Sequence, residues 1–303
     1  MILYNGIKIP DIGAGTYPFK EELVSTIPEL VEIGYRLFDT SDNYRNEQYL
    51  GEGLSQVPLD ILKDITVITK YSNPGKKVLK AFEESSRLIF SKTVMPNRKA
   101  NIYLMHWPYP YLWEVRWKEM ENLYLSGKCQ AIGVCNFNEE KLKKLLSICR
   151  VKPMINQFEC HPLFQQKEIQ EICRQEQIQV ISYSPLARIN KDLFNNITLN
   201  KIAQAHRKSI NQVILNWNVS EGRIPIPASK NKIHMRDNYS SFDFVLSDSE
   251  KAEIDALECG LRIRFDPDKR FSLIYKICFL VYSIYIKSVS KRSEFISKTK
   301  TDI

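Results

Sequence analysis

Four polar residues follow short apolar runs that predict β-strands: Asp39, Tyr44, Lys70 and His106. Each has an ordinary interpretation when taken alone, because a strand-end aspartate often caps a helix and a strand-end lysine is usually solvated. Together they supply a carboxylate, a phenol, a cation and an imidazole. Such a set can perform acid–base chemistry only where the fold brings the strand ends to one place.

The surrounding chain predicts that fold. The predicted strands cover residues 12–16, 37–39, 64–70, 100–105, 129–134, 154–158, 180–183 and the surroundings of Ile224. The predicted helices cover residues 21–34, 47–54, 78–90, 112–126, 139–149, 166–176 and 199–206. About eight strand–helix units without a linker favour one α/β domain, a (β/α)8 TIM barrel over residues 1–270. A doubly wound parallel sheet stays the alternative.

Composition excludes several classes of protein. The 303 residues are 44% hydrophobic and 26% charged, which excludes a disordered chain. Seven cysteines without a C-x-x-C pair give poor support for a zinc site, so we predict no metal. Unpaired thiols and the absence of a signal-peptide pattern at the N-terminus predict a cytoplasmic protein.

The segment Gly13-Ala-Gly15-Thr-Tyr-Pro18 superficially matches a dinucleotide-binding glycine loop. A proline stands where the third glycine of that loop belongs, so we interpret the segment as a tight turn after a strand.

Seven longer motifs stand in an order and spacing that resemble the aldo-keto reductase family, in particular its bacterial members. They cover residues 38–47, 68–70, 104–108, 131–137, 156–162, 183–186 and 224–231. The resemblance extends over roughly residues 1–270. It implies an NADP-dependent oxidoreductase that reduces an aldehyde or ketone to the alcohol, with hydride from the nicotinamide.

The resemblance assigns the four strand-end residues as the catalytic set. Tyr44 would donate the proton to the substrate oxygen, and a nearby Lys70 would lower the pKa of that phenol. Asp39 would hold Lys70 in place, and His106 would orient the substrate. The chemistry is consistent, because a free tyrosine with a pKa of about 10 is a reluctant proton donor.

The resemblance also implies a nicotinamide dinucleotide across the barrel mouth. The implied cofactor-binding residues are Gly15, Thr16, Asp39, Cys135, Asn136, Gln157, Tyr183, Ser184, Leu186, Ser229, Lys230, His234, Asp237 and Asn238. Asn136 and Gln157 would bind the carboxamide, and Tyr183 would stack on the nicotinamide. Cys135 replaces a serine of the family, and a thiol is a weaker hydrogen-bonding group.

The choice between NADPH and NADH depends on residues 228–238. Lys230 offers a cation to a 2′-phosphate, whereas His234 stands where many family members carry arginine. Arginine binds phosphate better than histidine does, so the replacement weakens the case for NADPH. We expect NADPH as the cofactor, and use of NADH stays open.

The expected substrate is a small carbonyl compound. Tyr17, His106 and Trp107 match positions that surround the substrate in the family, and their rings suit flat or apolar molecules. Nucleic acid fits poorly as a partner, because no basic run interleaved with aromatic residues occurs in the barrel.

Residues 271–303 depart from the family pattern and form a predicted second region. Residues 271–286 are predominantly apolar with Lys276 as their one charged residue, and residues 287–303 carry five Lys/Arg and two Asp/Glu. The apolar run is shorter than the ~20 residues that span a bilayer. Three interpretations remain: packing on the barrel or a partner, docking on a membrane surface, or a disordered end.

This tail supports a second hypothesis of another class, a cofactor-binding regulatory or scaffold subunit docked to a membrane complex. The distribution of charge along the chain is consistent with this second hypothesis. Its net charge is +8, but ten Lys/Arg and four Asp/Glu lie in residues 262–303, so most of the excess lies in these C-terminal residues, which include the tail.

Overall fold

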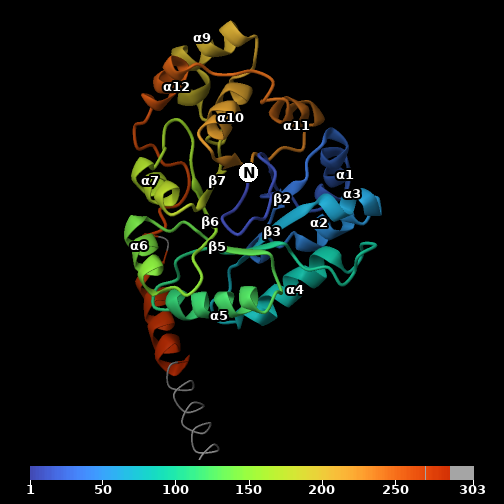
Figure 1. Ribbon diagram of the computed structural model, residues 1–303, viewed down its shortest axis with the longest axis vertical. Coiled ribbons are helices and arrows are strands. Elements are labelled where there is room, and N and C mark those ends of the chain that lie inside the picture. Colours follow the sequence, from blue (N-terminus) through green and yellow to red (C-terminus); the bar gives the residue numbers. More distant parts are fainter. Residues whose placement is uncertain (270, 287–303) are drawn as a thin grey trace, which may run out of the picture.

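The computed structural model describes residues 1–269 and 271–286. Eight parallel strands pair in chain order around the centre of the molecule (Figure 1). The strands are β1 (Ala14–Gly15), β2 (Leu37–Asp39), β3 (Thr66–Tyr71), β4 (Ile102–Met105), β5 (Ala131–Cys135), β6 (Ile155–Glu159), β7 (Gln179–Tyr183) and β8 (Ile224–Pro225). The last strand returns to the first, since Gly13 N donates to Pro225 O and Gly15 N donates to Pro227 O. The (β/α)8 barrel is thereby confirmed, and the doubly wound alternative was wrong.

Helices surround the strands on the outside (Figure 1). They are α1 (Leu23–Ile33), α2 (Glu47–Leu54), α3 (Leu59–Asp64), α4 (Val78–Phe90), α5 (Trp113–Leu125), α6 (Glu139–Ile148), α7 (Lys167–Gln175), α8 (Lys191–Phe194), α9 (Ile197–His206), α10 (Ile210–Ser220), α11 (Lys232–Tyr239) and α12 (Asp248–Asp255), with a 3-10 turn η1 (Asp42–Tyr44). The predicted helices all appear, whereas α3, α8, α10, α11 and α12 were not predicted. The start of α10 carried a signal, a capping box formed by Ser209 and Gln212.

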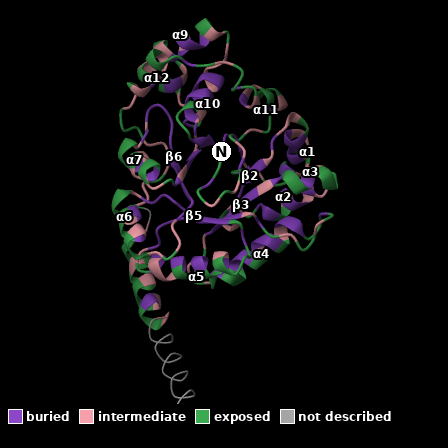
Figure 2. Ribbon diagram, viewed as in Figure 1, coloured by how far each residue is buried: buried purple, intermediate pink, exposed green. Residues whose placement is uncertain are grey.

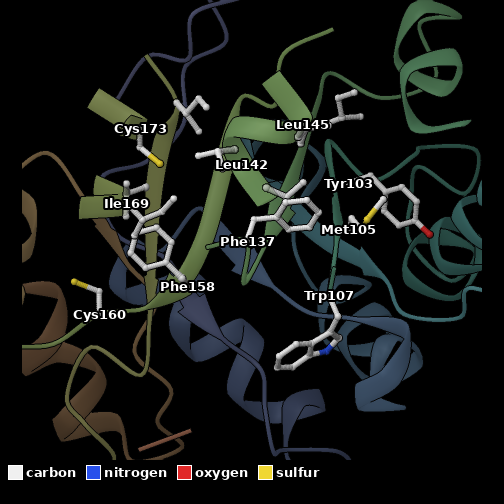
Figure 3. Packing of buried hydrophobic residues seen from close by; sticks show 14 of the residues in the cluster. Tyr103, Met105, Trp107, Phe137, Leu142, Leu145, Phe158, Cys160, Ile169 and Cys173 are labelled. Carbon is white, nitrogen blue, oxygen red and sulfur yellow. The ribbon is translucent and has the colours of Figure 1, made fainter. Parts of the chain in front are cut away.

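The barrel has an inner and an outer core. The strands are buried, and the helices turn their buried faces toward them (Figure 2). Between strands and helices, Leu142 of α6 packs near Phe137, and Ile169 and Cys173 of α7 pack near Phe158 (Figure 3). Branched apolar side chains from several strands form a separate cluster inside the barrel.

Polar residues follow the apolar residues of this inner cluster along the same face of two strands. Leu37 and Ile68 belong to the inner cluster. Two positions later on the same strands stand Asp39 and Lys70. Because residues i and i+2 of a strand face the same side, these polar groups follow the apolar filling at the carboxyl end of the barrel.

The apolar C-terminal segment forms a helix over residues 273–286 against the outside of the barrel. The ring of Phe279 lies 6.1 Å from that of Tyr109, and the Tyr282 hydroxyl donates to Gly75 O at 2.9 Å. The opposite face of this helix is exposed. No helix of the described residues has the length and the apolar run that a bilayer crossing requires. The basic residues of 287–303 lie outside the described part of the chain.

Candidate active site

Asp39, Tyr44 and Lys70 form one hydrogen-bonded group at the carboxyl end of the barrel. The fully buried ammonium of Lys70 donates to Asp39 Oδ1 at 2.6 Å and to the Thr40 carbonyl oxygen at 2.8 Å. It also donates to the Tyr44 hydroxyl at 3.3 Å. The 3-10 turn η1 presents Tyr44, and the hydroxyl of Ser41 caps that turn by accepting from Asn43 N. The three residues predicted from strand ends therefore meet.

His106 follows β4 and completes this group. Its ring meets the Tyr44 ring edge to face, with 5.6 Å between centroids. The Oγ atoms of Ser72 and Ser41 lie 2.7 Å and 3.1 Å from His106 Nδ1. These two hydroxyls, together with stacking on Trp107 at 5.5 Å, fix the orientation of the imidazole.

The ionisation of Tyr44 differs from the sequence-based expectation. Burial raises the pKa of Tyr44 to about 12, and Lys70 only offsets part of that rise. Burial disfavours the charge on Lys70, but the Asp39 carboxylate beside it raises the pKa of Lys70 above its ordinary value. Tyr44 therefore stays protonated next to a permanent cation. This pairing suits a phenol that gives up its proton only when an acceptor develops negative charge.

A cavity of about 500 Å³ lies directly against this group. Predicted site residues that line it are Gly15, Tyr17, Asp39, Tyr44, His106, Trp107, Asn136, Gln157, Tyr183, Ser184 and Leu186. Lys70, Thr16 and Cys135 are buried next to these residues and do not themselves line the cavity. The structure thus brings the predicted catalytic and substrate residues, and most of the inner cofactor residues, to one cavity.

The amide groups of this cavity suit a nicotinamide. Gln157 Nε2 donates to Asp39 Oδ2 at 2.8 Å, and Asn136 Nδ2 donates to His106 O at 3.0 Å. The Tyr183 hydroxyl donates to Asn136 Oδ1 at 2.7 Å, which places its aromatic ring beside the amides. Oriented amides next to a flat ring are the donor set that a carboxamide-bearing ring requires.

Two further predicted cofactor residues support the cavity from behind. The Thr16 hydroxyl donates to Asp39 O at 3.0 Å, and the Cys135 thiol donates to Gln157 Oε1 at 3.9 Å. The long sulfur contact holds the Gln157 amide more loosely than an oxygen contact does.

The predicted 2′-phosphate residues lie apart from the cavity lining, around the start of α11. Lys230 Nζ is 3.2 Å from Glu22 Oε1, in an ion pair exposed to solvent. Ser229 Oγ accepts from Asn231 N at 3.1 Å, and His234 is exposed. These three residues leave polar groups at the surface.

The next two predicted residues along α11 are engaged within the protein. Asp237 Oδ2 accepts a hydrogen bond from Ser209 Oγ at 2.6 Å. Asn238 is only 3% exposed. Asn238 therefore packs into the body of the protein and does not lie at the surface with Ser229 and Lys230.

A model of the aldo/keto reductase family matches residues 11–258, which is most of the chain. The chain belongs to the aldo/keto reductase family. Among curated relatives, the 9,11-endoperoxide prostaglandin H2 reductase of Trypanosoma cruzi is 36% identical over 277 residues, covering 89% of this chain and 95% of the relative. The glyoxal reductase of Bacillus subtilis is 34% identical over 272 residues, covering 88% and 95%.

Solved structures of the family agree in fold. The crystal structure of an aldo-keto reductase of Bombyx mori in complex with NADP has a TM-score of 0.82 to this family member and is 26% identical to it. The match covers 91% of this chain and 98% of the silkworm protein.

Several residues that line the cavity of this aldo/keto reductase were not predicted. They are Pro18, Asn43, Pro185, Arg188, Ile189, Ile226, Pro227, Ala228, Arg264 and Phe265. Ile226 to Ala228 stand inside a motif that already marked the region. Arg264 and Phe265 belong to a segment that resembles the end of bacterial family members, but neither residue was predicted individually, because the tertiary fold is what returns residues 262–266 to the barrel mouth. The described residues contain no cluster of three or more metal-ligating side chains.

Proposed function

We propose that this chain reduces an aldehyde or ketone to the alcohol, with Tyr44 as the proton donor. As a member of the aldo/keto reductase family, it is an NADPH-dependent oxidoreductase. One observation supports the assignment of Tyr44 above all: the buried Lys70 ammonium joins the Asp39 carboxylate to the Tyr44 hydroxyl beside a cavity of suitable size.

Each residue of the site has a defined part in this reaction. When bound, the dinucleotide supplies the hydride that reduces the carbonyl carbon. Tyr44 transfers its phenolic proton to the carbonyl oxygen as negative charge develops there, and Lys70 stabilises the resulting tyrosinate. Asp39 keeps Lys70 charged and in place, and His106 orients the carbonyl oxygen. A proton from solvent restores Tyr44, so the products are the alcohol and the oxidised dinucleotide.

The cofactor would lie along the cavity and out to α11. Asn136 and Gln157 would bind the carboxamide, with Tyr183 against the ring. Ser184 and Leu186 would lie along the pyrophosphate. Ser229, Lys230 and His234 would contact the 2′-phosphate, and Asp237 and Asn238 of α11 would face the adenine, as the family resemblance implies. We propose that NADPH is preferred and that NADH is used less efficiently, because Lys230 offers an ammonium group and His234 an imidazole to the 2′-phosphate.

A cofactor-paired substrate screen tests the assignment. Purified full-length protein is mixed with a panel of aldehydes and ketones, and consumption of NADPH and NADH is followed by absorbance. We expect reduction with both cofactors, faster with NADPH at low concentration, and strongly reduced turnover by Tyr44→Phe. Binding of NADPH without oxidation by any carbonyl would contradict the proposal.

The rival hypothesis of a regulatory or scaffold subunit gains no support. The two curated relatives reported above are both reductases, and their matches cover 89% and 88% of this chain. The catalytic set is also complete, with Lys70 paired to both Asp39 and Tyr44.

We further propose a cytoplasmic enzyme whose tail, residues 271–303, contacts an anionic membrane surface. The helix of residues 273–286 exposes large apolar side chains on the face turned away from the barrel: Leu273, Ile274, Tyr275, Ile277, Leu280, Val281, Ile284 and Tyr285. Five Lys/Arg and two Asp/Glu follow in residues 287–303. An apolar helix face followed by basic residues suits lipids with negative headgroups. The division of the chain at residue 270 stays a prediction.

Vesicle sedimentation tests this contact. We expect the full chain to bind phosphatidylglycerol vesicles and not phosphatidylcholine vesicles, and the triple variant Ile277→Ser, Leu280→Ser, Ile284→Ser to lose binding. Ile197→Ser removes an apolar side chain of α9 that is even more exposed, at 85%, and serves as the control. Equal binding by the triple variant, or no binding to either vesicle, would contradict the proposal.

A further inference from the structure

A cation lines the cavity close to the proposed proton donor. Arg264 and Phe265 belong to the lining, together with Tyr17. The guanidinium carbon of Arg264 lies 5.5 Å from the centroid of the Tyr17 ring. The Tyr17 ring in turn lies 5.1 Å from the ring of Tyr44. One aromatic ring therefore separates the positive charge from the hydroxyl that would protonate a substrate.

The backbone that carries Arg264 is held by a buried carboxylate. Glu159, the last residue of β6, is fully buried, and its carboxylate accepts from Ile263 N at 2.7 Å and from Arg264 N at 3.0 Å. His161 Nε2 lies 3.1 Å from the same carboxylate and fixes it further. The C-terminal segment is thereby anchored to the barrel, so the position of Arg264 is defined by the fold and not by a free loop.

The side chain of Arg264 makes no ion pair with any residue that the structure describes. Among the described residues, no carboxylate lies within ion-pair distance of its guanidinium. Its neighbour Arg262 differs: it packs over the ring of Phe164 at 4.3 Å and does not line the cavity. Of these two arginines, only Arg264 offers its donors to a molecule in the cavity.

We propose that the substrate carries an anionic group, such as a carboxylate, that pairs with Arg264. The inference rests on the proposed carbonyl reduction and names its substrate class: an aldehyde or ketone joined to the anion by a flat or extended spacer. The carbonyl oxygen lies at Tyr44 and His106, the spacer passes Tyr17, and the anion reaches the guanidinium. Arginine suits this part because its planar fork binds a carboxylate with two parallel hydrogen bonds.

Two aldehydes that differ only in charge test the inference. We compare 4-carboxybenzaldehyde with its neutral ester, methyl 4-formylbenzoate, at saturating NADPH. For the wild type we expect kcat/KM to be about 10-fold or more in favour of the carboxylate, the order of magnitude of a hydrogen-bonded charge pair. Arg264→Gln should abolish this preference through KM, and Arg264→Lys should retain part of it. Arg262→Gln removes the same charge from the same segment and should keep the preference.

The outcomes separate the inference from the proposed function. Equal kcat/KM for the two aldehydes, or a preference that survives Arg264→Gln, would overturn the inference and leave carbonyl reduction intact. A higher KM for NADPH in Arg264→Gln with an unchanged preference would assign the cation to the dinucleotide and also overturn it. Reduction of neither aldehyde, nor of any other carbonyl in the screen, would overturn both.

The same experiment contains a control for correct folding of Arg264→Gln. Turnover of the neutral ester by Arg264→Gln reports an intact site. If that turnover is lost, the salt dependence of the wild type decides. Added salt should lower kcat/KM for the carboxylate and leave the ester unchanged, because salt screens a partly exposed charge pair. An equal salt response of both aldehydes would count against the inference.

Discussion

Each end of the proposed cofactor site contains an ion pair between a lysine and a carboxylate, buried at one end and exposed at the other. At the reaction end, Lys70 and Asp39 are 2.6 Å apart, with side-chain exposures of 0% and 4%. At the outer end, Lys230 and Glu22 are 3.2 Å apart, with exposures of 59% and 45%. The inner pair lies within the barrel, whereas the outer pair lies in solvent.

This difference in burial suggests separate roles for the two pairs, one in the reaction and one in the choice of dinucleotide. A buried ion pair interacts strongly, and removal of one partner leaves an uncompensated charge in a medium that cannot solvate it. An exposed pair is screened by water and salt, and each partner can be released to bind a ligand at little cost. We therefore expect the inner residues to decide whether the reaction occurs, and the outer residues to decide which dinucleotide is favoured.

Tyr44→Phe should have the largest effect. It removes the phenolic proton donor and keeps the ring, so kcat should fall by about 100-fold to 10,000-fold, the usual range for a general acid. NADPH binding should be unchanged, because the proposed cofactor contacts are made by other residues. Steady-state kinetics and a fluorescence titration of NADPH measure the two quantities. A variant that keeps most of its kcat would remove Tyr44 from the mechanism.

Asp39→Asn should have the next largest effect, and it should lower the stability of the protein as well as its turnover. Lys70 would remain buried without its charged partner, next to the neutral amide that replaces the carboxylate, the Thr40 carbonyl and the Tyr44 hydroxyl. Loss of one partner of a buried pair costs about 3–5 kcal/mol. Urea unfolding should show this loss, and Glu22→Gln, which breaks the exposed pair, should leave the midpoint in place. Equal midpoints for the two variants would refute the contrast between the two ends.

A pH-dependent effect is expected from Glu47, a buried carboxyl beneath the reaction end. Burial raises the pKa of Glu47 to about 7, although the Thr69 hydroxyl donates to it at 2.5 Å. Because the folded pKa exceeds the unfolded value, Glu47 favours the folded state at low pH, and this contribution is lost as pH rises from about 4.5 through about 7.

The variant Glu47→Gln isolates this contribution. Near pH 5 the free energy of unfolding of the variant should match that of the wild type. Between pH 5 and pH 8 the wild type should lose about 2–3 kcal/mol of this free energy, whereas the variant should not. Urea unfolding at the two pH values measures the difference. Parallel pH dependence of the two proteins would mean that Glu47 does not titrate in this range.

Lys230→Ala should have the smallest effect. Loss of one exposed phosphate contact should raise the KM for NADPH by about 10-fold and leave the KM for NADH nearly constant, since only NADPH carries the 2′-phosphate. The ratio of the two KM values is the measurement. An equal rise for both dinucleotides would place Lys230 away from the 2′-phosphate.

Much of the fold and of the inner site could be predicted from local patterns. Asp39 and Lys70 stand at the ends of apolar strands, and a parallel barrel brings such ends to one edge. The ionisation of Tyr44 could not be predicted in the same way. The cation was expected to lower its pKa, but how far burial opposes that effect depends on every group packed around the phenol.

The sequence by itself determined the alternation of strands and helices, the motifs of the family and the types of residue at the strand ends, because these depend on neighbours a few positions apart. Only the tertiary structure decided what the C-terminal segment does. Glu159 binds the backbone of Arg264 across more than one hundred residues of chain, and no local pattern encodes such a contact. The charge at the cavity mouth, and with it the proposed choice of substrate, follows from that long-range hydrogen bond.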